Sequence, residues 1–190
     1  HLSIRRQRQM CIRDSENAIS IMMDAQMLLN GISRSLFATA DDELRPVMNG
    51  IYFDIHTDDL TFVASDGHKL VRLRNLSVKS PERASFILPK KPANLLKGLL
   101  SKEGEMVSIK FDDNNAYINC ANFEMVCRLI EGRYPNYNSV IPQENPFEVT
   151  IDRISFLNAL KRVSVFSNPA SSLVKLQLKE NEMLVSAQDI

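Results

Sequence analysis

Ser65, Asp66 and His68 lie within four positions of one another in the stretch VASDGHKLV. A serine close to a histidine can act as a nucleophile and general base, with His68 taking the proton of the Ser65 hydroxyl during attack on an acyl group. That chemistry also needs a group that orients the histidine and an oxyanion hole, and the sequence has no GxSxG nucleophile elbow. Three interpretations stay open: a Ser/His hydrolase, an ordinary hairpin with an exposed histidine, and the wall of a ligand groove.

The pair Asp66-Gly67 separates two β-rich runs, residues 60–65 and 68–73. It predicts a two-residue type I′ turn, because such a turn needs positive φ at both central positions and glycine adopts it without a steric penalty. This register places Ser65 opposite His68 and Val63 opposite Leu70, so that these four side chains share one face. Phe62 and Val71 then point into the core. Because the first face is only half polar, we expect another group to cover it, which favours the groove.

The hairpin belongs to a strand-helix-strand-strand-strand module that occurs twice and begins a third time. In the first copy Asp24 caps a helix, and the four strands are predicted at residues 18–23, 51–55, 60–65 and 68–73. The second copy has a lead strand at 85–89, a helix opened by Pro92, and the strands MVSIKF, NAYINC and NFEMVCRLI. The third starts at PFEVTID, and its helix is predicted to turn four apolar side chains inward: Phe156, Leu157, Leu160 and Val163. The pattern predicts an α+β fold with a duplicated β-α-β-β-β module.

The modules divide the chain into three predicted segments. Residues 1–16 are Arg-rich, do not begin with Met and show no period typical of a core; we interpret them as a non-native or disordered leader, with a functional basic arm as the alternative. Residues 17–143 form one domain of two modules. A stretch rich in Pro and Asn, EGRYPNYNSVIPQENP, then acts as a linker. Residues 144–190 begin a further domain, and we expect the chain to be truncated at both ends.

Composition excludes several classes of protein. The three cysteines have no CxxC spacing and do not cluster with histidines, so we expect no metal site, and nothing indicates a cofactor. No apolar run approaches the ~18 residues that a membrane span needs, and no signal-type stretch is present, which predicts a cytoplasmic protein. With 23 basic and 23 acidic residues, the chain is not a strongly basic nucleic-acid binder.

The distribution of charge is more informative than its sum. The second helix and its lead-in carry Lys90, Lys91 and Lys97 without an acid, and the third helix carries Arg153, Lys161 and Arg162. The acids gather on turns instead. Solvated surface is the simple interpretation of any one such helix, but the repeated bias indicates a surface that faces a polyanion. Basic side chains on helices can contact phosphates without reading bases, which gives weak and salt-sensitive binding.

Five strings resemble a known family when they are taken in order and spacing: LFATADDELRPVMNGIYFDI, TFVASDGHKLVRL, FILPKK, CRLIEGRYPNYNSVIP and FLNALKRVSVFS. They are similar to the β subunit of bacterial DNA polymerase III, the sliding clamp, and in particular to the version found in Bacteroides-type bacteria. The resemblance covers residues 17–190. It implies the DNA-clamp fold, with helices on one side of antiparallel sheets. It also implies three such domains per subunit, of which this chain holds the middle one and the opening part of the third.

The resemblance implies a processivity factor and not an enzyme. In this family two subunits close head to tail into a ring around duplex DNA, so a homodimer is expected of the full-length protein. Its helices line the hole, and nearby loops approach the DNA backbone, which carries over to Asp42, Arg45, Lys91, Lys97 and Arg162.

The family also has a hydrophobic pocket that receives short peptides with Leu or Phe anchors from DNA polymerase, clamp loader and repair proteins. Its wall carries over to Met48, Ser65, Gly67, His68, Leu70, Pro135 and Val140, and further residues of the last domain are expected beyond Ile190. By this comparison His68 is part of a pocket wall and not a catalyst. A generic interaction module is the alternative.

Overall fold

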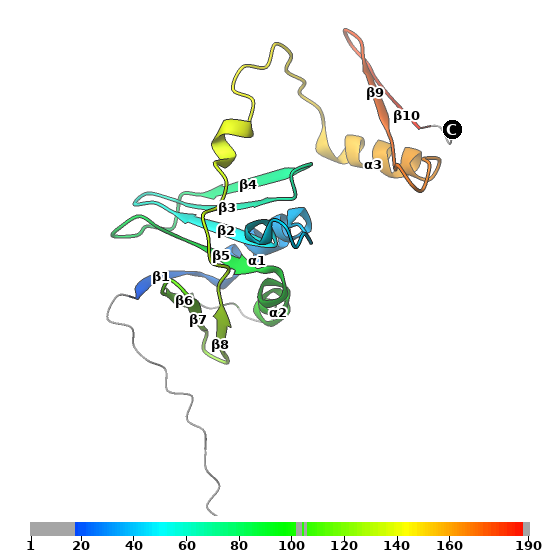
Figure 1. The fold of residues 1–190 in the computed structure, drawn as a ribbon. Coiled ribbons are helices and arrows are strands. Elements are labelled where there is room, and N and C mark those ends of the chain that lie inside the picture. The colour runs from blue at the N-terminus through cyan, green and yellow to red at the C-terminus, as the bar shows by residue number, and fades with distance from the viewer. Residues whose placement is uncertain (1–17, 102–103, 105, 188–190) are drawn as a thin grey trace, which may run out of the picture. The chain divides into compact units, whose positions relative to one another are not determined.

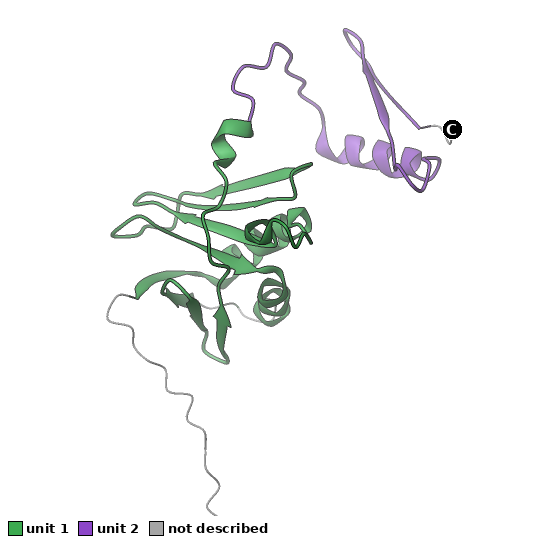
Figure 2. Cartoon of the chain, in the orientation of Figure 1, with its two compact units in different colours: residues 1–140 green, residues 141–190 purple. Residues whose placement is uncertain are grey.

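The computed structural model describes residues 18–101, 104 and 106–187 (Figure 1). The predicted leader, residues 1–16, lies outside the described residues. The chain divides into two compact units, His1–Val140 and Ile141–Ile190 (Figure 2). No helix in the described part of the chain is long and apolar enough to cross a membrane.

The first unit contains two four-stranded antiparallel sheets. One sheet has the order β4-β3-β2-β5 and consists of β2 (Gly50–Ile55), β3 (Leu60–Ser65), β4 (Leu70–Asn75) and β5 (Ala84–Pro89). The other has the order β1-β6-β7-β8 and consists of β1 (Ile19–Asp24), β6 (Met106–Phe111), β7 (Asn115–Asn119) and β8 (Glu124–Arg128). Each lead strand therefore joins the sheet of the other module, since β1 pairs with β6 and β5 pairs with β2. The two modules are interlocked.

Two helices, α1 (Ala25–Ser35) and α2 (Lys90–Leu100), lie side by side and pack against the sheets (Figure 1). The Asp24 carboxylate accepts the backbone N–H of Gln26 at 2.8 Å, as predicted for the N-cap of α1. Gly31 lets α1 approach the sheet closely, because a Cβ there would lie 2.5 Å from the ring of Phe62. This arrangement confirms the predicted α+β class with helices packed on antiparallel sheets.

Aromatic side chains join the two sheets into one core. Phe86 of β5 stacks on Phe53 of β2, with ring centroids 4.5 Å apart. The Phe86 ring also contacts the ring of Phe111 on β6, again at 4.5 Å. Since Phe86 and Phe111 belong to different sheets, the core is shared by both modules, and neither module has a separate one.

The predicted two-residue turn between β3 and β4 is wrong. Ser65 pairs with Leu70, so the connection has four residues, 66–69, and His68 lies in the loop and not opposite Ser65. The loop is longer because the Asp66 carboxylate accepts the backbone N–H groups of both His68 and Lys69, each at 2.9 Å, which satisfies them without strand pairing. In the observed register Val63 lies opposite Arg72, and Leu70 still shares a face with Ser65 and Val63.

The second unit contains α3 (Arg153–Ser164) and a hairpin of β9 (Lys175–Leu178) and β10 (Met183–Ser186). Asp152 caps α3 through the backbone N–H of Ser155, at 2.8 Å, as predicted. No residue of α3 is buried, in contrast to α1 and α2. Of the four apolar positions predicted to point inward, three are half-buried and Leu157 is exposed.

Candidate functional site

A cavity of about 260 Å³ lies beside the β3–β4 loop. Its lining includes all seven residues predicted for the pocket wall: Met48, Ser65, Gly67, His68, Leu70, Pro135 and Val140. The structure thus brings together residues from three separate parts of the chain. Four further residues also line it, and the sequence analysis did not assign them: Lys69, Tyr134, Asn136 and Tyr137. That this cavity binds peptides stays a prediction.

Hydrogen bonds fix the loop that forms one wall of the cavity. The Ser65 hydroxyl donates to the backbone carbonyl of Lys69 at 2.8 Å and accepts the backbone N–H of Gly67 at 3.1 Å. The single proton of this hydroxyl is therefore used within the loop, and it does not point to His68 as a nucleophile would to its base. This geometry argues against the hydrolase and assigns Ser65 a structural role.

The charged groups of the loop are paired with each other. The Asp66 carboxylate binds the Lys69 ammonium, and this hydrogen bond, with those from the loop backbone, holds the pKa of Asp66 well below its usual range. Asp66 therefore stays ionised, and its charge is balanced beside the cavity. Gly67 and the side chain of His68 are exposed at the cavity rim.

The loop that contains Asp42 and Arg45 adjoins the same wall. Arg45 Nε donates to Asp42 Oδ2 at 2.8 Å, and this bond is the main cause of the lowered pKa of Asp42. The Asn49 side chain closes the loop by bonding the backbone N–H and carbonyl of Asp42, both at 2.9 Å. Gly67 has φ of +90°, and a Cβ there would lie 2.8 Å from the Arg45 guanidinium. Met48, in the 3₁₀ turn η2 (Pro46–Met48), continues this loop into the cavity wall.

The opposite wall comes from the linker, which follows β8 and passes over the outer side of the β4-β3-β2-β5 sheet. The Tyr134 ring stacks on Tyr52 of β2, with centroids 4.7 Å apart and planes 5° apart. The Tyr137 hydroxyl donates to Asp54 of β2 at 2.7 Å. Tyr137 opens the 3₁₀ turn η3 (Tyr137–Val140), whose last residue is the wall residue Val140. The signal that the sequence analysis missed is the pair of tyrosines in RYPNY, which is unusual for a solvated linker.

Both linker phenols are neutral at physiological pH. Burial raises the pKa of Tyr134 to about 12, and the nearby backbone of Ser65 opposes this shift only in part. Burial, with the hydrogen bond to the Asp54 carboxylate, raises the pKa of Tyr137 to about 12 as well. The linker side of the cavity therefore presents aromatic and aliphatic surface without a charge, which suits an apolar anchor side chain.

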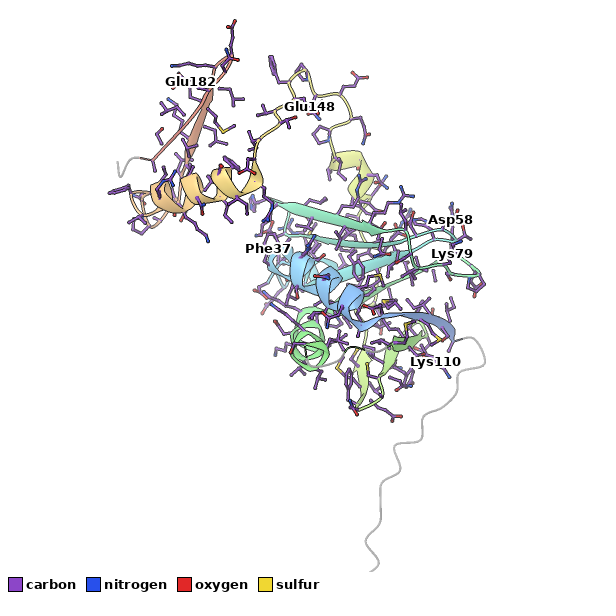
Figure 3. The ribbon with its side chains drawn as sticks, turned by 180° about the vertical axis from the view of Figure 1, so that it is seen from behind. Phe37, Asp58, Lys79, Lys110, Glu148 and Glu182 are labelled. Atoms are coloured by element: carbon purple, nitrogen blue, oxygen red, sulfur yellow. The ribbon has the colours of Figure 1, made fainter. Side chains whose placement is uncertain are left out.

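Four of the residues predicted to contact DNA belong to the first unit and one to the second. Asp42 and Arg45 are paired with each other, while Lys91 and Lys97 are exposed on α2. Lys90, at the start of the same helix, binds Asp41. Arg162 is exposed on α3 of the second unit. The turn between β2 and β3 is also acidic and contains Asp58. Asp58 lies at the opposite end of the sheet from Phe37, which follows α1 (Figure 3).

Two further features of the described residues concern metal binding and a second cavity. No group of three or more His, Cys, Asp or Glu side chains that could hold a metal ion occurs within residues 18–101 and 106–187. A larger cavity of about 840 Å³ lies between the linker, β5 and the β6–β7 turn, and none of the predicted site residues lines it.

Two interlocked β-α-β-β-β modules, with their helices packed on antiparallel sheets and an apolar cavity beside a hairpin, define a domain of the DNA-clamp class. The chain belongs to the family of the DNA polymerase III beta subunit, whose central-domain model matches residues 22–136, more than half of the chain.

Individual relatives agree with this family. A beta sliding clamp from Borreliella burgdorferi is 37% identical over 153 residues, which covers 78% of this chain and 39% of that relative. One from Synechococcus elongatus is 28% identical over 179 residues, covering 90% of this chain and 48% of that relative. The chain thus spans about half the length, or less, of these relatives.

Solved structures of the family share the fold. The DNA polymerase III subunit beta from Pseudomonas aeruginosa superposes with a TM-score of 0.85 at 25% identity, covering 93% of this chain and 49% of that one. The DNA polymerase III beta subunit from Thermotoga maritima gives a TM-score of 0.80 at 28% identity, covering 90% of this chain and 47% of that one.

Proposed function

We propose that this chain is part of a sliding clamp, the processivity factor of a replicative DNA polymerase. In this proposal residues 17–143 are the middle domain and residues 144–190 begin the third. Two full-length subunits form a ring around duplex DNA, and the protein has no catalytic residues of its own. Family membership supports the proposal. The duplicated, interlocked β-α-β-β-β module favours it over a generic interaction module, for which this duplication is not expected.

The convergence of seven residues, spread from Met48 to Val140, around one cavity is the observation that carries the proposal. The cavity combines aliphatic walls at Met48, Leu70 and Val140 with a rim fixed by hydrogen bonds between the Ser65 hydroxyl and the loop backbone. Such a site suits a short peptide with an apolar anchor. Full burial of one Leu or Phe side chain contributes about 1.5–3 kcal/mol, so two or three anchors give exchangeable binding of about micromolar affinity.

The DNA contacts in this proposal are few and weak. Exposed basic side chains on helices, such as Lys91 and Lys97, meet phosphates without reading bases. A ring holds DNA by its topology, so strong contacts would only prevent sliding, and a chain with balanced charge fits that requirement. Partners that dock in the cavity become processive because tethering raises their effective concentration at the primer end.

The partners in this proposal are double-stranded DNA, bound without sequence preference, and DNA polymerase, clamp loader and repair proteins, bound through short peptide motifs. The proposal places the protein in the cytoplasm. The finer prediction of a Bacteroides-type clamp rests on the sequence strings alone, since the relatives named above come from other bacteria.

Fluorescence anisotropy with a labelled QLxLF-type peptide tests the pocket. We expect His68→Ala combined with Leu70→Ala to weaken binding, because the pair removes one rim and one wall side chain. Leu76→Ala is the matched control, since Leu76 is 65% exposed just after β4 and does not line the cavity. Unchanged affinity in the double variant would reject the proposed site.

A further inference from the structure

The linker is attached to the outer face of the β4-β3-β2-β5 sheet by side chains from two different strands. Tyr134 stacks on Tyr52, and Tyr137 donates to Asp54, both partners being on β2. Arg72 of β4 donates to the side-chain oxygen of Asn138, at 3.3 Å. These contacts fall within residues 134–138, in the part of the linker that lines the cavity from Tyr134 to Val140.

The contact between Tyr137 and Asp54 differs from the other two. Asn138 and Arg72 are exposed, whereas Tyr137 is 9% exposed and its hydroxyl reaches a carboxylate at 2.7 Å. A hydrogen bond to an ionised acceptor is about twice as strong as one between neutral groups. The other oxygen of the same carboxylate lies 3.3 Å from Nε2 of His56, the residue after β2, which helps to fix its orientation.

Apart from the Tyr137 bond and the exposed contact with Arg72, the hydrogen bonds of the turn that ends at Val140 are local within the described residues. One of them runs from the Ser139 hydroxyl to the carbonyl of Asn136, at 2.7 Å. Val140 is 67% exposed and ends η3, the single 3₁₀ turn that Tyr137 begins. The backbone bond within this turn, from Ser139 N to the carbonyl of Asn136, is long at 3.3 Å. An isolated turn of this kind is marginal without tertiary contacts, because its hydrogen-bond geometry is poor. The place of Val140 in the wall therefore depends on how Tyr137 is attached.

We propose that Asp54 and Tyr137 are positioning residues for the peptide pocket: their hydrogen bond fastens η3 to β2 and so holds Val140 at the cavity. This inference rests on the proposed function and deepens it. It states that Asp54, a residue of the sheet outside the cavity, controls the position of one pocket wall. Asp54 does not line the cavity, and it acts only through Tyr137.

The test measures peptide affinity by anisotropy for wild type, Tyr137→Phe, Asp54→Ala and the double variant. Tyr137→Phe removes one hydroxyl and keeps the ring, and we expect it to weaken binding about tenfold, which corresponds to ~1.4 kcal/mol. Tyr117→Phe on β7 is the matched control, since it deletes the same atom on the other sheet. If the two residues act through each other, the peptide affinity of the double variant should be no lower than that of the single variant with the lower affinity.

A rescue variant separates positioning from general destabilisation. Asp54→Asn keeps an oxygen that accepts the Tyr137 hydroxyl, so it should bind the peptide more tightly than Asp54→Ala. Peptide affinity in Tyr137→Phe equal to that of wild type would overturn the proposal. So would losses that multiply in the double variant, because they would show that the two residues act independently.

Hydrogen exchange of the amides at 137–140 gives a readout that needs no peptide. We expect faster exchange there in Tyr137→Phe than in wild type, with the strands unchanged. If wild type fails to bind the peptide while this difference appears, the peptide pocket is contradicted for this chain, and the attachment of η3 to β2 by Tyr137 stands. If exchange at 137–140 is unchanged, the positioning role is wrong, whatever the peptide does.

Discussion

Replacing Gly67 by alanine tests how the loop at the cavity is built. Gly67 has φ of +90°, a region that residues with a Cβ rarely adopt. Forcing alanine into left-handed backbone costs roughly 1–2 kcal/mol. The new Cβ would also lie 2.8 Å from the Arg45 guanidinium, but that atom ends a flexible, half-exposed side chain, which can move away at small cost. We therefore expect the free energy of unfolding to fall by about 1–2 kcal/mol, mostly from backbone strain.

Urea denaturation followed by circular dichroism measures this change. Gly98→Ala is the matched control, because Gly98 lies inside α2 and a Cβ there meets no atom within 4 Å. An alanine in a helix interior should raise stability by roughly 0.5–1 kcal/mol, so the same substitution has opposite signs at the two sites. A second control combines Gly67→Ala with Arg45→Ala, which removes the steric contact and leaves the strain. Stability of Gly67→Ala equal to wild type, or full recovery in the combined variant, would refute this account of the loop.

Two further predictions concern the core and the linker. Phe86→Ala should lower the free energy of unfolding by about 3–5 kcal/mol, because Phe86 contacts both sheets. If the modules are interlocked, residues of both sheets should lose protection from hydrogen exchange together. Loss of protection in one sheet alone would contradict this. Stability should fall as pH rises from about 10 through about 12, because burial raises the pKa of Tyr137 from 10.0 to about 12 and the unfolded chain therefore ionises first. Thermal unfolding across this range should show a shallower fall in Tyr137→Phe, and identical slopes would count against the buried phenol.

Local pattern predicted the elements of the first unit well. Asp24 caps α1 as expected, and β3 occupies Leu60–Ser65, the predicted run. These features depend on side chains that are neighbours in sequence, so that one segment contains all the information. The β3–β4 loop was predicted less well because its length depends on a competition between the strand ladder and the Asp66 carboxylate for the same backbone N–H groups.

The exchange of lead strands could not be predicted in this way. β1 and β5 are both short apolar runs that precede a helix, and nothing in either run says which sheet it joins. The choice is made by contacts across the whole unit, such as that of Phe86 with Phe111. The same limit applies to Tyr134 and Tyr137, because their partners on β2 are far away in sequence. Asp54 and Tyr137, for example, are 83 positions apart.

The proposed DNA loop and the proposed peptide cavity share a wall, and this affects how variants at either site are interpreted. Arg45 is bound to Asp42 on one side and lies against Gly67 on the other, while Met48 at the end of the same loop lines the cavity. An Arg45 variant thus removes a basic side chain and also frees the loop beside the cavity. Weaker DNA binding in such a variant is evidence for a phosphate contact only if peptide affinity is unchanged. Lys97 is a cleaner probe of DNA binding, because it is exposed on α2 and does not line the cavity.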